Sequence, residues 1–173
     1  MDKRWLGILI ILIVGCCCMY FVATSSDSVG LSITKVNKTL ITLPSDFSIE
    51  DTEKGSAKII NWNTNQTIHI KDLGKQDNAF DKFQEKINEL KKDPKIKING
   101  NSTRNISGKP TYTIDITNTT SGNPDNSTIA YVFTCNHTFV LKLKNYKDNK
   151  NKLNHDLDFV VKNMKIDYKQ SQD

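Results

Sequence analysis

Histidine, cysteine and carboxylate side chains are the groups in this sequence that could bind a metal or transfer a proton. The three histidines, His69, His137 and His155, fall on different predicted elements, and none has a histidine four residues away or a cysteine pair nearby. Zinc sites depend on such close ligand spacing. The sequence therefore predicts no metal site. It favours a solvent-facing position for His69 and burial of Cys135 as a small apolar residue.

Acidic pairs are the remaining candidates for acid–base chemistry. Glu85 and Glu89 lie four residues apart among lysines, which is typical of a solvated helix face, and Asp156 and Asp158 form a second pair. The sequence contains neither the Gly-x-Ser-x-Gly elbow of a serine hydrolase nor a glycine-rich phosphate loop. We predict no catalytic and no cofactor-binding residues. Three aromatic residues could line a groove, although core packing is the stronger expectation: Trp62, Tyr112 and Tyr131.

The acceptor pattern for N-linked glycosylation, Asn-x-Ser/Thr, occurs seven times among 18 asparagines. Chance would give about three at this composition. The enrichment favours an extracytoplasmic domain in a eukaryotic or archaeal cell, and the short anchor with its small domain favours an archaeal surface. The candidate acceptors are Asn37, Asn65, Asn101, Asn105, Asn118, Asn126 and Asn136.

An uncharged segment, residues 5–23, stands near the start of the sequence. As a helix it would span about 28 Å, close to the ~30 Å thickness of the bilayer hydrocarbon. We predict a retained transmembrane anchor. Two alternatives stay open: cleavage of a secretory signal near Ala23, and lipidation at Cys16 as in a bacterial lipoprotein. The run of Cys16, Cys17 and Cys18 is expected to pack as small residues within the bilayer, with acylation or a dimer contact as the alternative.

The flanks of this segment predict its orientation. Lys3 and Arg4 precede it, and the next basic residue is Lys35, so the positive-inside rule leaves residues 1–4 in the cytoplasm. Residues 24–30 are small and polar, as in a flexible linker, and residues 31–173 are expected to form an extracellular domain. That domain has one cysteine and so no internal disulfide, which leaves its stability to the core.

The charge pattern argues against a nucleic-acid partner. The net charge is +5, and the lysines are interspersed with acids and asparagines instead of forming a basic stripe with aromatic residues. This pattern is typical of a solvated surface. The expected partners are therefore the membrane, through the N-terminal helix, and an envelope protein or wall component.

Hydrophobic spacing predicts an α+β domain. Residues 79–93 and 152–166 have helical periodicity, and the first of these helices is expected to be capped by Asp77-Asn78 and ended by Asp93-Pro94. Short runs between turn residues alternate with a period of two, as antiparallel strands do. They are residues 40–43, 57–62, 67–70, 96–98, 112–116, 129–135 and 139–143, with a short strand-like end at 165–167. The two amphipathic helices are expected to cover the sheet, one on each side.

Four motifs resemble the PsbP-like superfamily over about residues 38–167. They are Leu40–Ile49 (LITLPSDFSI), Ile106–Tyr112 (ISGKPTY), Tyr131–Leu141 (YVFTCNHTFVL) and Asp158–Ile166 (DFVVKNMKI). The resemblance implies an αβα sandwich that usually binds other proteins or serves as an accessory subunit. It implies no shared catalytic residues.

These observations favour a tethered, non-enzymatic binding or accessory module of the cell envelope. One alternative is an envelope enzyme or sensor with a small-molecule pocket between the sheet and a helix, which a concave pocket with convergent polar groups would favour. A passive structural spacer is the third hypothesis.

Overall fold

The structure is a computed structural model of the 173-residue chain, and it describes residues 33–166 except 77, 121–123, 135–136 and 148. Several predicted features lie outside the described residues: the anchor 5–23 with Cys16, Cys17 and Cys18, the linker 24–30, Cys135 and the acceptor Asn136. Within the described part of the chain, no helix has the length and apolar character needed to cross a bilayer.

Strands and helices alternate unevenly along the described residues. In chain order they are β1 (Ile33–Val36), β2 (Thr39–Thr42), β3 (Ser48–Glu53), β4 (Ser56–Asn61), β5 (Gln66–Asp72), α2 (Ala79–Lys92), β6 (Ile96–Ile106), β7 (Lys109–Asn118), β8 (Asp125–Phe133), β9 (Thr138–Lys144), α3 (Lys150–Lys162) and β10 (Met164–Ile166).

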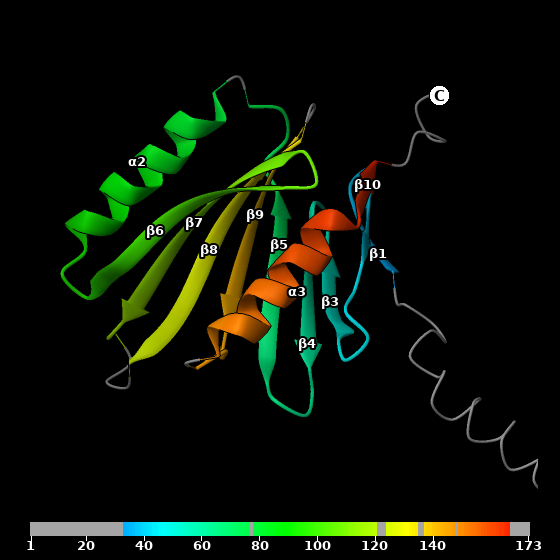
Figure 1. Cartoon of the computed structure of the whole chain (residues 1–173), viewed down its shortest axis with the longest axis horizontal. Helices are drawn as coiled ribbons and strands as arrows, with labels where there is room; N and C mark the ends of the chain where they lie inside the picture. The colour runs from blue at the N-terminus through cyan, green and yellow to red at the C-terminus, as the bar shows by residue number, and fades with distance from the viewer. Residues whose placement is uncertain (1–32, 77, 121–123, 135–136, 148, 167–173) are drawn as a thin grey trace, which may run out of the picture. The chain divides into compact units, whose positions relative to one another are not determined.

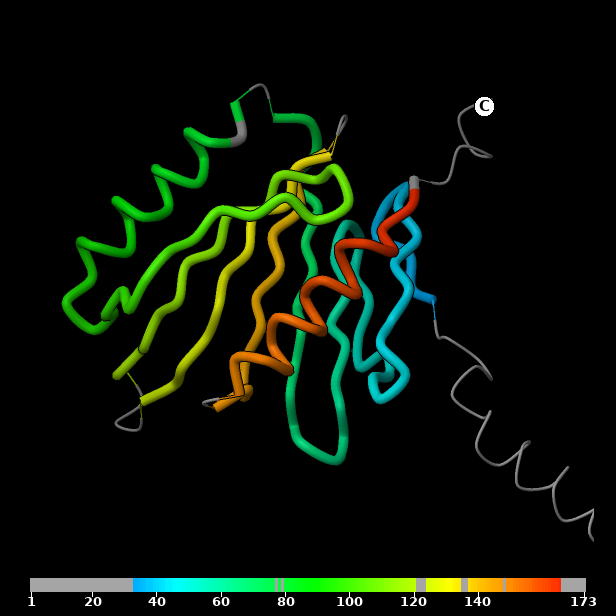
Figure 2. The backbone as a smooth tube through the Cα atoms, viewed as in Figure 1, coloured from blue at the N-terminus to red at the C-terminus, as the bar shows by residue number. Residues whose placement is uncertain are grey.

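A seven-stranded antiparallel sheet forms the centre of the domain, in the order β3-β4-β5-β9-β8-β7-β6 (Figure 1). Strands that follow one another closely in the chain pair as hairpins. In contrast, β5 pairs with β9, although α2 and β6–β8 separate the two strands in the sequence. A smaller antiparallel sheet, β1-β2-β10, brings the first and last described strands together (Figure 2). The predicted α+β class with an antiparallel sheet is confirmed.

Both outer strands of the large sheet are irregular. The register of β3 against β4 shifts between Ile49 and Asp51, and that of β6 against β7 shifts between Ile98 and Gly100. Such shifts mark β-bulges, which bend a strand and break the regular row of backbone groups. Every residue of β3 is exposed, and three of its six are acidic.

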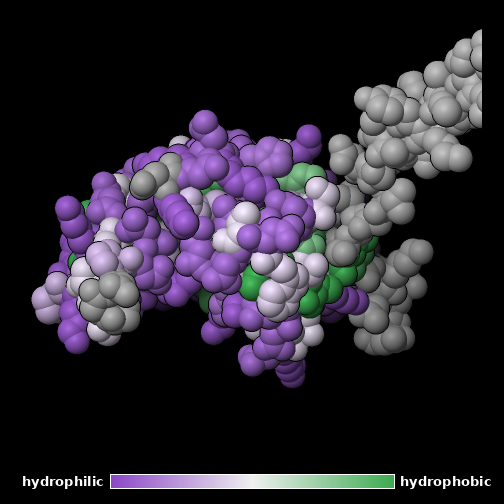
Figure 3. Space-filling view, turned by 90° about the horizontal axis from the view of Figure 1, so that it is seen from below, coloured by the Kyte–Doolittle hydropathy of each residue, from purple (hydrophilic) through white to green (hydrophobic). Residues whose placement is uncertain are grey.

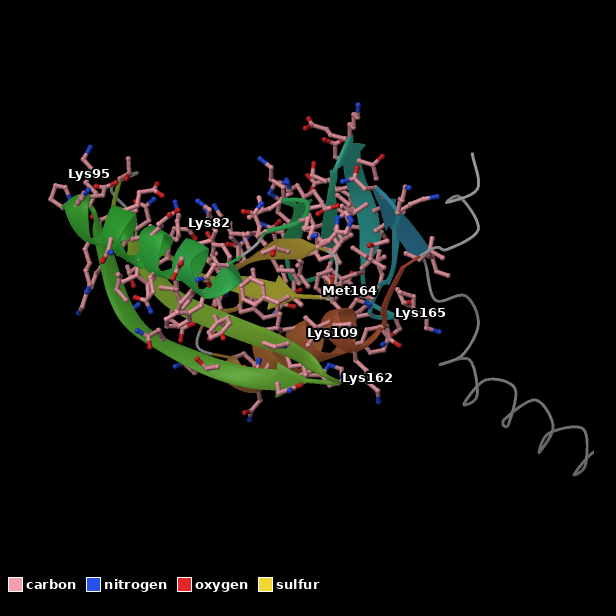
Figure 4. All side chains as sticks on the ribbon, turned by 90° about the horizontal axis from the view of Figure 1, so that it is seen from above. Lys82, Lys95, Lys109, Lys162, Met164 and Lys165 are labelled. Carbon is pink, nitrogen blue, oxygen red and sulfur yellow. The ribbon has the colours of Figure 1, made fainter. Side chains whose placement is uncertain are left out.

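Each face of the large sheet has its own core, because successive side chains of a strand point to opposite faces. On β8, Ile129 and Tyr131 pack with Phe83 of α2, whereas Ala130 and Val132 belong to the core that contains residues of α3. Figure 4 shows Lys82 of α2 and Lys162 of α3 on opposite sides of the strands. The prediction of one helix on each side is confirmed.

The helix ends follow from local chemistry. Asn78 caps α2 by accepting a hydrogen bond from the Asp81 amide, and Asp93 ends it before Pro94, as predicted. The second helix is shorter than its hydrophobic period suggested. Met164 was expected on its buried face, but the helix reaches its C-cap at Asn163 and Met164 begins β10, where it pairs with Ile41 of β2.

Removal of a core side chain tests this arrangement. Leu141 of β9 is fully buried in the α3-side core. Leu141→Ala is expected to lower the free energy of unfolding by about 2–5 kcal/mol, through lost burial and a residual cavity. Denaturant unfolding of the full chain, followed by circular dichroism, measures the loss. Asn151→Ala, on the exposed side of α3, serves as the control and is expected to change stability by less than about 0.5 kcal/mol. A cost for Leu141→Ala as small as that of the control would contradict this core.

Candidate functional site

A concave pocket of about 600 Å³ lies between the sheet and the start of α3. Its floor comes from β6, β7 and β8, and its wall from α3 and the β9–α3 loop. The lining residues are Asn99, Gly100, Asn101, Ser102, Thr113, Asp115, Ile116, Asn126, Ser127, Thr128, Leu143, Tyr146, Lys147, Lys150, Leu153 and Asn154. Ligand pockets in proteins have volumes of roughly 300–1,000 Å³. We call this concavity the sheet pocket.

Hydroxyl and amide groups pair with one another across the floor of the sheet pocket. Ser102 Oγ and Thr113 Oγ1 lie 2.7 Å apart, and Thr128 Oγ1 donates to Asp115 Oδ1 at 2.6 Å. At the end of the floor, Thr117 Oγ1 donates to Asn126 Oδ1 at 2.7 Å. Cross-strand pairs of this kind fix side chains in one orientation. The floor is thus a preformed polar surface.

The charged groups of the sheet pocket, within the described residues, do not form the nucleophile–histidine arrangement of a hydrolase. The Asp115 carboxylate is held by Thr128, and its other oxygen lies 3.6 Å from the Lys150 ammonium, whose side chain is 80% exposed. Nucleophilic catalysis needs a nucleophile hydrogen-bonded to a base that a third group orients. Of the hydroxyls that line the sheet pocket, none contacts a histidine among the described residues. The arrangement suits binding.

A buried ionic network holds the wall of the sheet pocket in place. The carboxylate of Asp156 is fully buried and accepts from the Tyr146 hydroxyl at 3.0 Å and from the Lys152 ammonium at 3.0 Å. Lys152 also donates to Asp46 at 2.8 Å and lies 5.9 Å from the centre of the Phe47 ring. The network ties the start of α3 to the β2–β3 and β9–α3 loops.

The network changes the pKa values of its members. Burial is the main cause that raises the pKa of Tyr146, and the charge and hydrogen bond of Asp156 raise it further. Burial acts to lower the pKa of Lys152, but hydrogen bonds to Asp46 and Asp156 outweigh it and leave the pKa raised. Tyr146 therefore stays a hydrogen-bond donor, and Lys152 stays charged, over the physiological pH range.

A second, more open concavity of about 770 Å³ adjoins the sheet pocket. Asn63 and Thr64 of the β4–β5 turn and Gln66 at the start of β5 line it together with Asn145, Tyr146, Lys147 and Asn149 of the β9–α3 loop. Tyr146 and Lys147 line both concavities, which therefore border one another at these two residues. We call this second concavity the loop pocket. The β4–β5 turn and the start of α3 lie at the lower end of the sheet in Figure 1.

The structure does not bring the predicted chemistry-bearing residues together. His69 is exposed as expected, whereas His137 Nδ1 lies 2.9 Å from the buried carboxylate of Asp72, and His155 Nδ1 lies 3.1 Å from Asp156. Glu85 and Glu89 are exposed and pair with lysines on α2. No group of three or more metal-ligating side chains occurs among the described residues.

The aromatic candidates have different environments. Tyr131 is buried and Tyr112 packs against the α2-side core, as expected. Core packing was wrong for Trp62, which is 68% exposed, because β4 ends at Asn61 and the next residue already lies in the turn. Sequence reasoning did not select Tyr146 or Asp115. Their burial and contacts arise from segments far apart in the sequence, and no local pattern signals them.

The candidate glycosylation acceptors within the described residues also differ in environment. Asn37 Nδ2 donates to the buried Asp72 at 2.7 Å, and the side-chain oxygens of Asn118 and Asn126 accept hydrogen bonds from Thr120 and Thr117. Three further acceptors are exposed: Asn65 in the β4–β5 turn, and Asn101 and Asn105 on β6. Their occupancy stays a prediction.

The raised pKa of Tyr146 predicts a loss of stability at high pH. The folded chain keeps the phenolic proton, whereas the unfolded chain releases it near its ordinary pKa of 10.0. Stability from this group is therefore complete below pH 10 and falls above it by about 1.4 kcal/mol per pH unit. Denaturant unfolding between about pH 9 and pH 11.5 is expected to show that the free energy of unfolding declines less steeply with pH for Tyr146→Phe than for the wild type. The pKa values of Lys152 and Tyr131 are also raised, and their contributions to this decline remain in both proteins. Equal slopes for both proteins would contradict the buried Tyr146–Asp156 contact.

Comparisons with known proteins concern the fold. No protein-family pattern and no curated protein matches the sequence. Solved structures do match. The solution structure of cyanobacterial PsbP (CyanoP) from Synechocystis is 12% identical with a TM-score of 0.52, and the match covers 80% of this chain and 95% of that chain.

Two further structures have similar scores. The crystal structure of LpqN, described as involved in cell envelope biogenesis of Mycobacterium tuberculosis, is 17% identical with a TM-score of 0.53, covering 80% of this chain and 86% of that chain. A crystal structure from Bacteroides thetaiotaomicron is 15% identical with a TM-score of 0.57, covering 78% of this chain and 47% of that chain. The resemblance stated from the sequence motifs is thus confirmed: the domain has the PsbP-like fold.

Proposed function

We propose that this chain is a non-enzymatic binding module of the cell envelope, tethered by residues 5–23 and acting outside the membrane. The fold supports an accessory role, because similar structures include CyanoP and the envelope-biogenesis protein LpqN. The uncharged segment and its basic flank support the tether and its orientation. The sequons support exposure to glycosylation machinery.

The observation that carries the proposal is the sheet pocket. It has the size of a ligand site, and its polar floor is already ordered, so little conformational entropy is lost when a partner group enters. Among the described residues, none of its hydroxyls pairs with a histidine, and its one carboxylate, Asp115, is held by Thr128. A pocket with these properties suits the binding and orientation of a ligand group.

A sensor of a small molecule is the second candidate, and the position of the sheet pocket between sheet and helix favours it. The two functions differ in what occupies the pocket. A binding module of the envelope would hold part of a macromolecular wall component or protein, whereas a sensor would hold a small solute and change its contacts with another protein.

Blocking the sheet pocket with a large side chain distinguishes both binding functions from a passive structural spacer. Asn154 is an exposed α3 residue that lines the pocket, and Asn151 is an exposed asparagine one turn earlier that does not. Asn154→Trp is expected to reduce recovery of envelope material in affinity capture from the native membrane extract by at least about tenfold, because the indole fills the cavity. Asn151→Trp is expected to behave as wild type. Equal recovery with both variants would contradict binding through the pocket.

The tether predicts an intact, membrane-bound chain. Native protein from the membrane fraction is expected to begin at residue 1 or 2 and to become accessible to external protease after the anchor, as measured by intact mass and N-terminal sequencing. A mature N-terminus near Ser26 would indicate signal cleavage, and one at Cys16 with added lipid mass would indicate a lipoprotein. An unprocessed chain in the cytoplasmic fraction would contradict the envelope placement.

A further inference from the structure

Trp62 is an exposed indole held on an ordered turn. The Asn61 side-chain oxygen accepts hydrogen bonds from the amides of Asn63 at 3.0 Å and Thr64 at 3.2 Å, and Asn61 Nδ2 donates to Asp46 at 2.8 Å. These bonds fix the turn on both sides of Trp62, yet the indole itself remains 68% exposed. A large exposed aromatic ring on a fixed backbone is typical of a binding anchor, since little entropy is lost when it makes a contact.

The same turn is tied to the loop across from it. Asn145 Nδ2 donates to the Asn65 carbonyl at 2.7 Å, and Thr64 Oγ1 donates to Gln66 Oε1 at 3.0 Å. The Asn145 contact joins the β4–β5 turn to the β9–α3 loop and closes the walls of the loop pocket. Trp62 directly precedes Asn63, one of the wall residues.

The side chains of the loop pocket define the chemistry of its ligand. Its walls carry amides, the two hydroxyl-bearing residues Thr64 and Tyr146, one lysine and no carboxylate. An amide group both donates and accepts hydrogen bonds, and so matches neutral hydroxyl groups, which do the same. A strongly anionic ligand would need more than one cation. Some wall amides already bond within the fold, as Asn145 does to the Asn65 carbonyl and Asn149 to the Lys152 amide, and a ligand would use the amide donors and acceptors beyond these bonds. Hydrophilic residues also predominate on this side of the domain, with hydrophobic residues in one smaller area (Figure 3).

We propose that the loop pocket and Trp62 bind a neutral oligosaccharide chain, with one sugar ring stacked on the indole and the hydroxyls of a neighbouring sugar bonded to the amide walls. A sugar ring presents an apolar C–H face that suits an aromatic ring, and hydroxyls around its edge that suit amides. Because both pockets border Tyr146 and Lys147, we expect the next sugars along the chain to reach the hydroxyl floor of the sheet pocket. The inference rests on the proposed function and names the class of its ligand.

The test uses the full chain with Trp5→Phe, which leaves Trp62 as the one remaining tryptophan of the two in the sequence. The protein is prepared in a detergent without a sugar headgroup and in a host that leaves the sequons unmodified. Cello-, manno- and chito-hexaose are titrated separately while the Trp62 emission is recorded. A saturable change in emission with at least one of these three neutral oligosaccharides is expected.

Calorimetry on variants assigns the site. Trp62→Ala is expected to weaken binding by about tenfold or more, because stacking and desolvation of the ring are lost. Phe80→Ala is the matched control, since Phe80 is an exposed aromatic residue on α2 outside both pockets, and it is expected to leave binding unchanged. No saturable change with any of the three probes, an unchanged affinity of Trp62→Ala, or stronger binding of a polygalacturonate oligomer would overturn the proposal. If the oligosaccharide test fails while the capture of envelope material succeeds, the chain is still a binding module, with a different ligand. If both experiments fail, the binding-module function is contradicted as well.

Discussion

The pairing of β5 with β9 is the constraint on which the rest of the domain depends. It joins the β3–β5 hairpins to the β6–β9 meander, and without it the sheet would be two separate pieces, one of three strands and one of four. The alternate side chains Phe139, Leu141 and Leu143 of β9 are fully buried on the α3 side. Because the chain continues from β9 directly into Asn145-Tyr146-Lys147, the strand that closes the sheet also positions the residues shared by both pockets.

The ionic network beneath this loop fixes the position of the start of α3, and its formation requires that charged groups lose their contact with water. A fully buried carboxylate is tolerated when donors surround it, and Asp156 has three such neighbours, in Tyr146, Lys152 and His155. Breaking one contact would leave charge uncompensated in the interior, so the arrangement favours one position of the α3 start over all others. The wall of the concave surface is therefore held in place by the buried charges beneath it, whereas the sheet is held together by hydrophobic burial.

The elements were predictable from sequence because their signals are local. The ends of α2 are set by residues at those ends, Asn78 and Asp93-Pro94. Each strand is marked by the period-two alternation of its own residues. The candidate site was not predictable in the same way. Its floor comes from three strands and its wall from a helix many residues later, and Asp115 or Tyr146 has no distinguishing neighbour in the chain. Trp62 was misplaced for a related reason: one residue decides whether a side chain is the last of a strand or the first of a turn.

The two bulged outer strands of the large sheet affect how copies of the domain can meet. A regular, exposed strand offers unpaired backbone groups to the same strand of another copy, and long rows of such contacts lead to aggregation. Here β3 is bent near Glu50 and lined with like charges, and β6 is bent near Gly100. Neither outer strand of the large sheet therefore offers a straight edge that the same strand of another copy could extend.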